Sequence, residues 1–368
     1  MPSSFRAVYH VRSDVHSIEA RARAIAVEQS VEMPVTAIED PFVLSEIVGR
    51  VEQIEEKFPG LFEVVVALST ATVGDDAGQL LNMLFGNTSL QDDVVLYDAV
   101  FPDAFAKMFG GPRHGLAGLR QRAGAGKRAL TASALKPQGL RPGALARLAR
   151  CFAEGGIDYI KDDHGLADQS YSPFAERVGA ISQALRGVDS VRCYAPSLSG
   201  DLASMRRQVR IATEAGVDTV MVAPMIAGLG NFHTLVRENP DVSFLAHPSL
   251  AGAARIAPAF LIGKLFRLLG ADAVIFPHYG GRFGYSLDTC RELARAALAV
   301  QNGVRPASPV PAGGMRRERV GELLDFYGAD VMLLIGGGLL EAGDKLTEAT
   351  AAFVAAVRSY AYRPAAGD

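Results

Sequence analysis

The residue types best suited to chemistry lie close together in residues 155–164, whose sequence is GGIDYIKDDH. The β-branched and aromatic residues of this run predict a buried strand that ends in a lysine, two aspartates and a histidine. Because successive side chains of a strand point to opposite faces, Lys161 and Asp163 share one face. Asp162 and His164 share the other face until the chain turns. Burying such a group is costly unless its members contact a metal ion, a substrate or each other, so the run predicts an active site, with a charged turn as the alternative.

Similar residues follow other predicted strands, and these strands define the element pattern. From residue 112 onward, short apolar strands alternate with helices of roughly a dozen residues. Eight such units predict a (β/α)8 barrel, for which an open doubly wound sheet is the structural alternative. We expect the strands at Thr131–Lys136, Ile157–Asp162, Val191–Ala195, Thr219–Ala223, Ser243–His247, Ala273–His278, Ser308–Gly313 and Val331–Gly336. We expect helices between them, among others at Pro142–Glu154, Pro173–Leu185, Leu202–Ala215, Ala257–Leu269, Ser286–Val300 and Arg317–Tyr327.

The carboxyl ends of these strands carry the candidate functional residues. In a closed barrel all eight ends meet at one face, where barrel enzymes have their active sites. Any one of these residues could have a purely structural role; His247, which precedes Pro248, could be a buried histidine with satisfied hydrogen bonds. The occurrence of the whole set at strand ends predicts a functional site. The set consists of Lys136, Lys161, Asp163, His164, His247, His278, Gly313, Gly314, Gly336, Gly337 and Gly338.

Two glycine turns and the charged run indicate the chemistry of this site. Gly313-Gly314 and Gly336-Gly337 follow the seventh and eighth strands, where backbone N–H groups can approach a phosphate closely. Lys161, Asp163 and His164 could hold one divalent ion such as Mg²⁺, provided that a CO2 adduct turns the Lys161 amine into a carbamate, and the ion would polarise a carbonyl group. Lys136, which follows the first strand, could then move a proton. The expected substrate is therefore a phosphorylated carbonyl compound.

Residues 1–111 predict a separate α+β domain, which is joined to the barrel domain, residues 112–368, near Gly110-Gly111-Pro112. The order strand, helix, strand, strand, helix, strand predicts a ferredoxin-like sandwich. Glu28 and Asn87 lie near element ends, where isolated polar residues are most often caps or surface groups. The expected elements are Phe5–Val11, Ser17–Gln29, Val48–Glu56, Leu61–Ala67, Asp76–Phe85 and Asp93–Ala99.

The composition is typical of a soluble globular protein and excludes several partner classes. Of 368 residues, 49% are hydrophobic and 21% charged, and the formal net charge is −3. A protein with this net charge is not expected to bind nucleic acid or an anionic membrane by electrostatic attraction. Basic residues do cluster at Arg113–Arg128 and Arg316–Arg319, but most of them are expected to be solvated. Three widely spaced cysteines predict neither a disulfide framework nor a structural zinc site, which fits a reducing cytoplasm. We expect no signal peptide and no membrane span.

Several motifs together resemble the ribulose-bisphosphate carboxylases over nearly the whole chain. Residues 135–140 (LKPQGL) are similar to the first-strand lysine motif of that family, and residues 156–163 (GIDYIKDD) are similar to its carbamylated-lysine and metal motif. Residues 109–115 (FGGPRHG), 311–314 (PAGG) and 336–338 (GGG), with His247 and His278, extend the resemblance.

The resemblance implies specific roles for the candidate residues. Lys161, converted by CO2 to a carbamate, would bind one Mg²⁺ ion with Asp163, and His164 is a further candidate ligand. Lys136 or His247 would move the proton, and the glycine turns would bind phosphate. Glu28 and Asn87 would reach the site from the neighbouring subunit, which makes a homodimer with shared active sites the minimum unit. The alternative is that these two residues serve only their own domain.

Departures from the carboxylase pattern indicate a RuBisCO-like protein (form IV), which keeps enolate chemistry without productive carboxylation. Gln138 stands where carboxylases have a second lysine, and His164 replaces a metal-binding glutamate. Pro248 occupies the place of a phosphate-binding arginine. The loop after the sixth strand lacks the carboxylase lysine, and its nearest cation is Arg282, whose planar group is no simple substitute.

Three functions follow as hypotheses. The preferred one is an isomerase or enolase of the methylthioribulose 1-phosphate type, because nothing obvious closes over a second substrate. The second is a decarboxylase or transcarboxylase/hydrolase of the 3-oxo-isoapionate 4-phosphate type, which would pass through the same enolate. The third is a non-catalytic regulatory protein on an enzyme fold.

Overall fold

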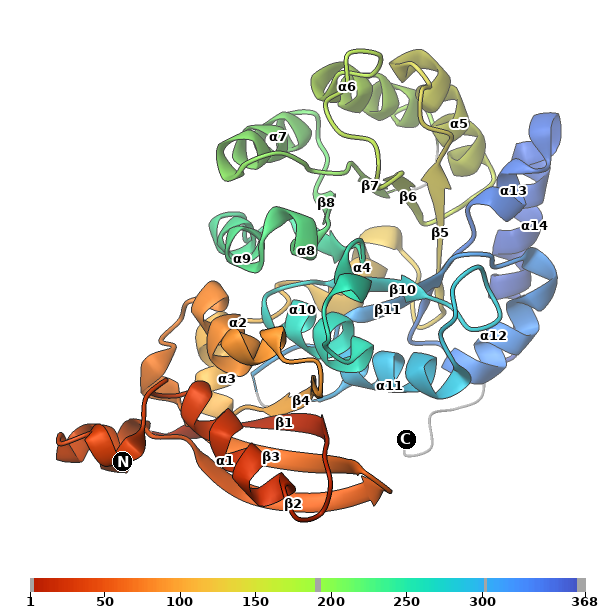
Figure 1. The fold of residues 1–368 in the computed structure, drawn as a ribbon. Helices are drawn as coiled ribbons and strands as arrows, with labels where there is room; N and C mark the ends of the chain where they lie inside the picture. Colours follow the sequence, from red (N-terminus) through yellow and green to blue (C-terminus); the bar gives the residue numbers. More distant parts are fainter. Residues whose placement is uncertain (1–2, 189–192, 301–302, 363–368) are drawn as a thin grey trace.

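The computed structural model describes residues 3–188, 193–300 and 303–362. An antiparallel sheet with its helices precedes a ring of parallel strands that is surrounded by further helices, and the two parts pack side by side (Figure 1). The predicted fold class, a ferredoxin-like α+β domain followed by a (β/α)8 barrel, is confirmed. None of the helices in the described ranges has the length and apolar character needed to cross a membrane.

The N-terminal sheet forms because its strands alternate in hydrophobicity. In β1 (Ser4–Arg12) every second residue is buried, and these side chains share one hydrophobic cluster with apolar residues of α1 (Ile18–Glu28) and α2 (Ala77–Phe85). The sheet order is β2-β3-β1-β4 with antiparallel neighbours, as the predicted motif requires. The other strands are β2 (Arg50–Phe58), β3 (Leu61–Ser69) and β4 (Val94–Val100).

The start of β2 differs from the prediction. The strand begins at Arg50 rather than at Val48, because the chain before it forms the π-helix Val43–Ile47. Gly49 then passes so close to α1 that a Cβ atom there would lie 2.5 Å from the carbonyl oxygen of Ala26. This close passage explains why glycine precedes the strand.

The barrel consists of eight parallel strands at the predicted places. They pair in the orders β12-β5-β6-β7 and β8-β9-β10-β11, and a bridge between Ser197 and Met221 joins β7 to β8. β11 and β12 lie next to each other and complete the ring. The first residues of the third predicted strand, Val191 and Arg192, lie outside the described residues. The strands are β5 (Leu130–Leu135), β6 (Tyr159–Asp162), β7 (Cys193–Ala195), β8 (Thr219–Val222), β9 (Ser243–Ala246), β10 (Ala273–Pro277), β11 (Ser308–Ala312) and β12 (Met332–Leu334).

Helices cover the outside of this ring, as predicted. The stretch predicted as a helix at Ala257–Leu269 is instead a π-helix, Ala259–Leu265, that continues into the short α10 (Phe266–Leu268). Gly263 packs against α11 there, and a Cβ atom at this position would lie 2.8 Å from the Cβ of Ala296. The main outer helices are α5 (Pro142–Glu154), α6 (Phe174–Leu185), α7 (Leu202–Glu214), α9 (Leu229–Glu238), α11 (Leu287–Leu298), α12 (Val320–Tyr327) and α14 (Leu346–Arg358).

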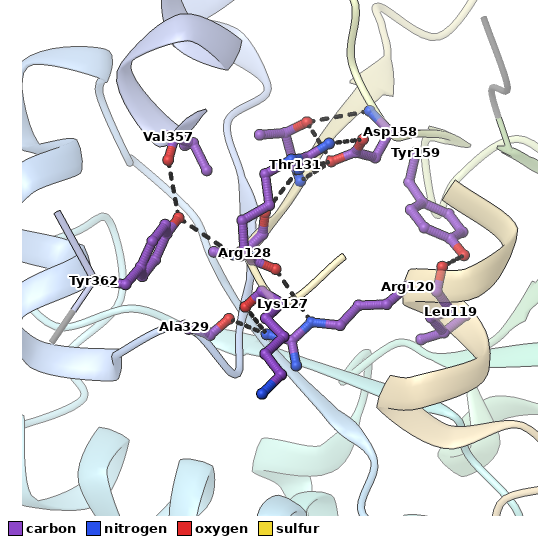
Figure 2. A network of polar contacts seen from close by, with 11 residues as sticks. Leu119, Arg120, Lys127, Arg128, Thr131, Asp158, Tyr159, Ala329, Val357 and Tyr362 are labelled. Atoms are coloured by element: carbon purple, nitrogen blue, oxygen red, sulfur yellow. Dashed lines mark hydrogen bonds and ion pairs between the residues drawn. The ribbon is translucent and has the colours of Figure 1, made fainter. Parts of the chain in front are cut away.

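One helix closes the end of the barrel at which the strands begin. Leu116 and Leu119 of α4 (Gly115–Ala123) belong to the hydrophobic core inside the barrel, together with inward-facing strand residues such as Tyr159 and Met332. The Tyr159 hydroxyl donates to the carbonyl oxygen of Leu119 at 2.9 Å (Figure 2). Because α4 fills this end, the opposite end, at which the strands finish, is the one available for a site.

Four aspartates at strand starts hold the segment that contains α4. A Gly-x-Asp sequence lies just before each of the strands β6, β8, β10 and β12. The aspartate of each of these four sequences binds at least one residue in the segment 114–128. Figure 2 shows one of these pairs, Arg128 with Asp158, in which both guanidinium N–H···O bonds measure 2.7 Å. The others are Arg122 with Asp218, Arg120 with Asp330, and the backbone N–H groups of His114 and Gly115 with Asp272.

This arrangement corrects the expectation that the arginines of the first basic cluster are mostly solvated. Arg120, Arg122 and Arg128 are largely shielded from solvent because their guanidinium groups bind strand-start aspartates and backbone carbonyl oxygens. A planar guanidinium can satisfy several acceptors at once, which suits this junction between a helix and four strands.

The N-terminal sheet is joined to the barrel through β4. The backbone N–H of Leu96 donates to the carbonyl oxygen of Arg255, and the N–H of Ala257 donates to the carbonyl oxygen of Leu96. Asp98 also forms an ion pair with Lys264 at 2.9 Å. The β4 edge therefore contacts the segment that follows β9.

Candidate active site

Three candidate side chains reach the open end of the barrel because they occupy inward-facing positions. Lys136 follows β5, Lys161 lies in β6 and His247 follows β9. Each continues a row of alternate residues whose earlier members lie in the core inside the barrel. The members of that core on the three strands include Ala132, Tyr159 and Leu245, respectively.

These side chains form one connected group with residues 163 and 164. The Lys136 Nζ atom donates to Asp163 Oδ1 at 2.6 Å, and His164 Nδ1 lies 3.4 Å from the same oxygen. The rings of His164 and His247 are stacked, with their centroids 4.6 Å apart and their planes 8° from parallel. The predicted residues of β5, β6 and β9 are thus brought together.

Lys161 is the most deeply buried charge-bearing member of the group. Only 4% of its surface is exposed, and its Nζ atom donates to the backbone carbonyl oxygen of Asp162 at 2.8 Å. Burial lowers the pKa of Lys161 to about 8, against the opposing effect of the nearby Asp163 carboxylate. About a tenth of this amine is therefore uncharged at pH 7, far more than for a solvated lysine.

Asp163 remains ionised in the same surroundings. Burial alone would raise the pKa of its carboxyl group. Hydrogen bonds from His164 and Lys136, together with the positive charge of the two lysines, outweigh burial and lower that pKa. The carboxylate is therefore available to bind a cation.

His247 is a neutral imidazole with a defined tautomer. Burial, reinforced by the charge of Lys161, lowers the pKa of His247 to about 2. The backbone N–H of Ser249 donates to His247 Nδ1 at 3.3 Å, and the Ser249 hydroxyl lies 2.8 Å from the same nitrogen. Because Nδ1 accepts, Nε2 carries the proton and can donate a hydrogen bond.

Asp162 faces the other side of β6, as the alternation of side chains predicts. Its carboxylate accepts from Arg177 of α6 at 3.0 Å, from the Tyr194 hydroxyl at 2.8 Å and from the backbone N–H of Ser197 at 3.1 Å. Asp162 and Arg177 are completely buried. This pair fixes β6 against the outer helix layer, so that the neighbouring residues 161 and 163 project inward.

The two glycine turns lie beside this group. A Cβ atom on Gly336 would lie 3.9 Å from Lys136 Cε, so the turn after β12 approaches the lysine directly. Gly313 and Gly314 have φ angles of 90° and 100°, which glycine adopts without strain. A Cβ atom on Gly338 would lie 3.1 Å from the Met315 carbonyl oxygen, so the two turns also contact each other.

His278 lies beside the start of the Gly313-Gly314 turn, since its backbone N–H donates to the Ala312 carbonyl oxygen at 2.8 Å. It follows β10, its side chain is fully buried, and its Nδ1 atom lies 3.3 Å from the hydroxyl group of Tyr327 in α12. Burial lowers the pKa of His278 to about 4. Within residues 3–188, 193–300 and 303–362, no hydrogen bond or ion pair joins it to Lys136, Lys161 or Asp163.

Glu28 and Asn87 contact each other in the N-terminal domain. The Asn87 side-chain amide donates to Glu28 at 3.0 Å and to Glu32 at 2.8 Å. In the described part of the chain, no hydrogen bond joins either residue to the barrel group. Within one chain they are therefore a separate polar cluster.

Two residues that mark the departures from the carboxylase pattern, Gln138 and Arg282, lie beside residue 165 and beside the Gly313 turn. The Gln138 amide rests against Gly165, where a Cβ atom would lie 1.4 Å from Gln138 Nε2. The exposed Arg282 donates its backbone N–H to the Gly313 carbonyl oxygen at 3.0 Å, and its guanidinium carbon lies 5.6 Å from the ring centroid of Phe283. The loop after β10 is thereby docked on the turn after β11.

Sequence reasoning did not identify Ser249 and Glu32. Ser249 directs the His247 tautomer, and a hydroxyl residue two positions after a strand-end histidine was the available signal. Glu32 reaches Asn87 because its backbone is left-handed, with φ of 55°, which glutamate rarely adopts and which no local pattern indicated.

The donor atoms fit the Mg²⁺ ion that the resemblance implies, provided that Lys161 becomes a carbamate. In the described residues, no group of three or more His, Cys, Asp or Glu side chains could hold a metal ion without it. The neutral form of the Lys161 amine has a nitrogen lone pair that can add to CO2 and form a carbamate with loss of a proton. A carbamate oxygen and the Asp163 carboxylate are hard ligands that suit Mg²⁺, and His164 lies beside them.

Comparisons with known proteins agree with this geometry. The family model for the ribulose bisphosphate carboxylase large chain, catalytic domain, matches residues 115–360. The 5-methylthioribulose-1-phosphate isomerase of Rhodospirillum rubrum is 60% identical over 99% of this chain and 98% of its own length. A 2,3-diketo-5-methylthiopentyl-1-phosphate enolase of Geobacillus kaustophilus is 32% identical over 80% of this chain and 74% of its own. The crystal structure of a Rubisco-like protein from Rhodopseudomonas palustris, 50% identical, has a TM-score of 0.92 and covers 99% of this chain and 100% of that one.

Proposed function

The chain belongs to the RuBisCO-like proteins of the ribulose bisphosphate carboxylase large-chain family, and we propose that it isomerises 5-methylthioribulose 1-phosphate. The observation that carries this proposal is the identity of 60% to an isomerase of that name over 99% of the chain. The enolase relative is 32% identical, so enolase activity is the second candidate.

The residues of the site support an enolisation. Lys136 removes the proton from the carbon next to the carbonyl group and returns it to the former carbonyl carbon. Its amine is placed for this transfer because it lies between Asp163 and the turn at Gly336. His247 donates a hydrogen bond from Nε2 to the oxygen on which negative charge develops. The imidazole is neutral and its Nδ1 atom is engaged by Ser249, so the Nε2–H group is the one that faces the substrate as a donor.

The remaining residues bind and orient the substrate. The turns at Gly313-Gly314 and Gly336-Gly337 bind the phosphate group through backbone N–H groups. Carbamylated Lys161, Asp163 and His164 hold Mg²⁺, which when bound supplies a Lewis acid for the substrate carbonyl group. Glu28 and Asn87 of a second copy complete the site, so that the active unit is a homodimer.

The proposal is tested with purified protein, Mg²⁺ and bicarbonate in deuterated water. Incubation with 5-methylthioribulose 1-phosphate is expected to give a phosphorylated isomer with deuterium at one carbon and no loss of carbon, followed by proton and phosphorus NMR. Failure of the carbamylated, Mg²⁺-loaded protein to change this substrate would refute the isomerase assignment.

The same samples separate the alternatives. Turnover of 2,3-diketo-5-methylthiopentyl 1-phosphate without isomerisation would make the protein an enolase. Release of CO2 from 3-oxo-isoapionate 4-phosphate would make it a carbon–carbon lyase. A folded protein that changes none of the three would support the regulatory hypothesis.

A further inference from the structure

Leu250 combines an unfavourable backbone conformation with high exposure. Its φ and ψ angles are 67° and −4°, in the left-handed region that leucine rarely adopts because Cβ approaches the backbone. The residue lies in a tight turn, in which the Ala251 N–H donates to the Pro248 carbonyl oxygen at 3.0 Å. Glycine or asparagine is favoured at such a position.

Packing within the chain does not explain why leucine occupies this turn. The side chain is 58% exposed, so most of its surface gains nothing from the hydrophobic core. A strained backbone that holds an exposed apolar side chain points to a role in binding.

This turn lies at the open end of the barrel. Ser249, the neighbour of Leu250, contacts Nδ1 of His247, and the His247 ring is stacked on His164. Leu250 therefore lies one residue from a direct contact of the candidate catalytic group.

The loop after the adjacent strand has the same character. Ile226, in α8 (Pro224–Ala227) after β8, is 66% exposed, and the His247 N–H donates to the Val222 carbonyl oxygen at the end of β8. Residues 219–231 and 243–254 contain no lysine, arginine, aspartate or glutamate. The β8–β9 side of the barrel mouth is therefore apolar and uncharged, whereas the glycine turns follow β11 and β12.

We propose that Leu250 is a specificity-determining residue that contacts the uncharged, apolar end of the substrate, distal to the phosphate. This assignment rests on the proposed function and adds the subsite for the methylthio group. Burial of a thioether against these two apolar, uncharged loops is favourable. The loops also have no cation with which to bind a second phosphate. The site thus selects a sugar that carries one phosphate and one apolar end.

The test replaces Leu250 by asparagine, which tolerates the left-handed region and has a similar size. We expect Leu250→Asn to lower kcat/KM for 5-methylthioribulose 1-phosphate by about tenfold more than for ribulose 1-phosphate, which has a hydroxyl group in place of the thioether. The melting temperature should stay equal or rise. Val300→Asn, the same kind of change at an exposed residue after α11, should leave the ratio of the two kcat/KM values unchanged.

A binding measurement separates failure of this assignment from failure of the proposed function. By calorimetry, wild-type protein should bind butyl phosphate more tightly than inorganic phosphate, and Leu250→Asn should remove that preference while inorganic phosphate still binds. This outcome is independent of isomerase activity.

Three results would overturn the assignment. The first is an equal loss of kcat/KM for both sugar phosphates, and the second is an unchanged preference for butyl phosphate. The third is dissociation of Leu250→Asn into smaller species on size-exclusion chromatography, which would make Leu250 a subunit contact instead.

Discussion

Lys161 is a basic side chain placed where positive charge is costly, and this placement decides its chemistry. Burial moves the pKa of Lys161 down to about 8, below that of a solvated lysine. Asp163 shows the opposite balance, because hydrogen bonds and lysine charges outweigh burial and keep it ionised. Two neighbouring residues thus supply an amine that can react with CO2 and an anion that can bind a cation.

The lowered pKa predicts how activation by CO2 depends on pH. The reactive neutral fraction of Lys161 rises about tenfold per pH unit below its pKa and levels off above it. We therefore expect the initial rate of activation by CO2 and Mg²⁺ to rise up to about pH 8 and then to reach a plateau. Samples activated at different pH and assayed at one common pH measure this rate. A rate that still climbs steeply above pH 9.5 would mean that Lys161 has the pKa of an exposed lysine, and Lys161→Arg provides the unactivated baseline.

Lys136 is predicted to be the residue that moves the proton. Lys136→Met should lower kcat by roughly a hundredfold or more, because general acid–base catalysis contributes at least that much. The rate at which the substrate proton exchanges with deuterated solvent, measured by NMR, should fall together with kcat. Lys127→Met, a lysine at the opposite end of the barrel, is the matched control and should behave as wild type. Wild-type exchange in Lys136→Met would assign the proton transfer to another residue.

At the scale of elements, the alternation of side chains along the strands determines which residues point into the site. The Gly-x-Asp sequences at the strand starts bind the segment that closes the opposite end of the barrel. Inward rows place Lys136, Lys161 and His247 at the open end, while Asp162 turns outward to Arg177. At the other end, the strand-start aspartates bind the segment of α4. The two ends of the barrel therefore divide function and stability between them.

Asp272 is predicted to contribute strongly to stability through its backbone contacts. Its buried carboxylate accepts from the backbone N–H groups of His114, Gly115 and Phe244. Asp272→Ala would leave these donors without a partner, so we expect the free energy of unfolding to fall by about 3 kcal/mol. Thermal and denaturant unfolding measure this loss.

Asp330 provides the matched control for that experiment. Its ion pair with Arg120 is 2.7 Å long, but the Asp330 side chain is more than half exposed. Asp330→Ala should therefore cost less than about 1 kcal/mol. Equal losses in both variants would contradict the assignment of stability to the buried backbone contacts.

At the scale of the whole molecule, one chain keeps Glu28 and Asn87 apart from the barrel group. If the site is shared between copies, Glu28→Gln and Lys161→Ala subunits should each be inactive alone and complement each other when mixed. Random mixing should restore about a quarter of the wild-type sites, because half of the dimers are hybrids and each hybrid has one intact site. Turnover after subunit exchange measures this. Mixtures that stay inactive would assign Glu28 to its own chain.

The sequence alone determined the order of the strands, the barrel and the group at the ends of β5, β6 and β9, but not the helix α4 that closes the other end. These follow from local periodicity, because hydrophobic alternation fixes which side chains point inward and strand ends fix where they emerge. Even the outward turn of Asp162 was predictable in this way.

Only the tertiary structure decided which of these residues meet. The contact of Lys136 with Asp163, the stacking of His164 on His247 and the contact of His278 with Tyr327 depend on the closure of the barrel and on turns beyond the strand ends. The partners of Arg120, Arg122 and Arg128 were equally hidden, because they come from distant segments. The left-handed backbone of Leu250 was hidden too, because leucine is not a residue type that indicates it. Periodicity describes a side chain's direction within its own element, whereas its partners depend on how separate elements pack.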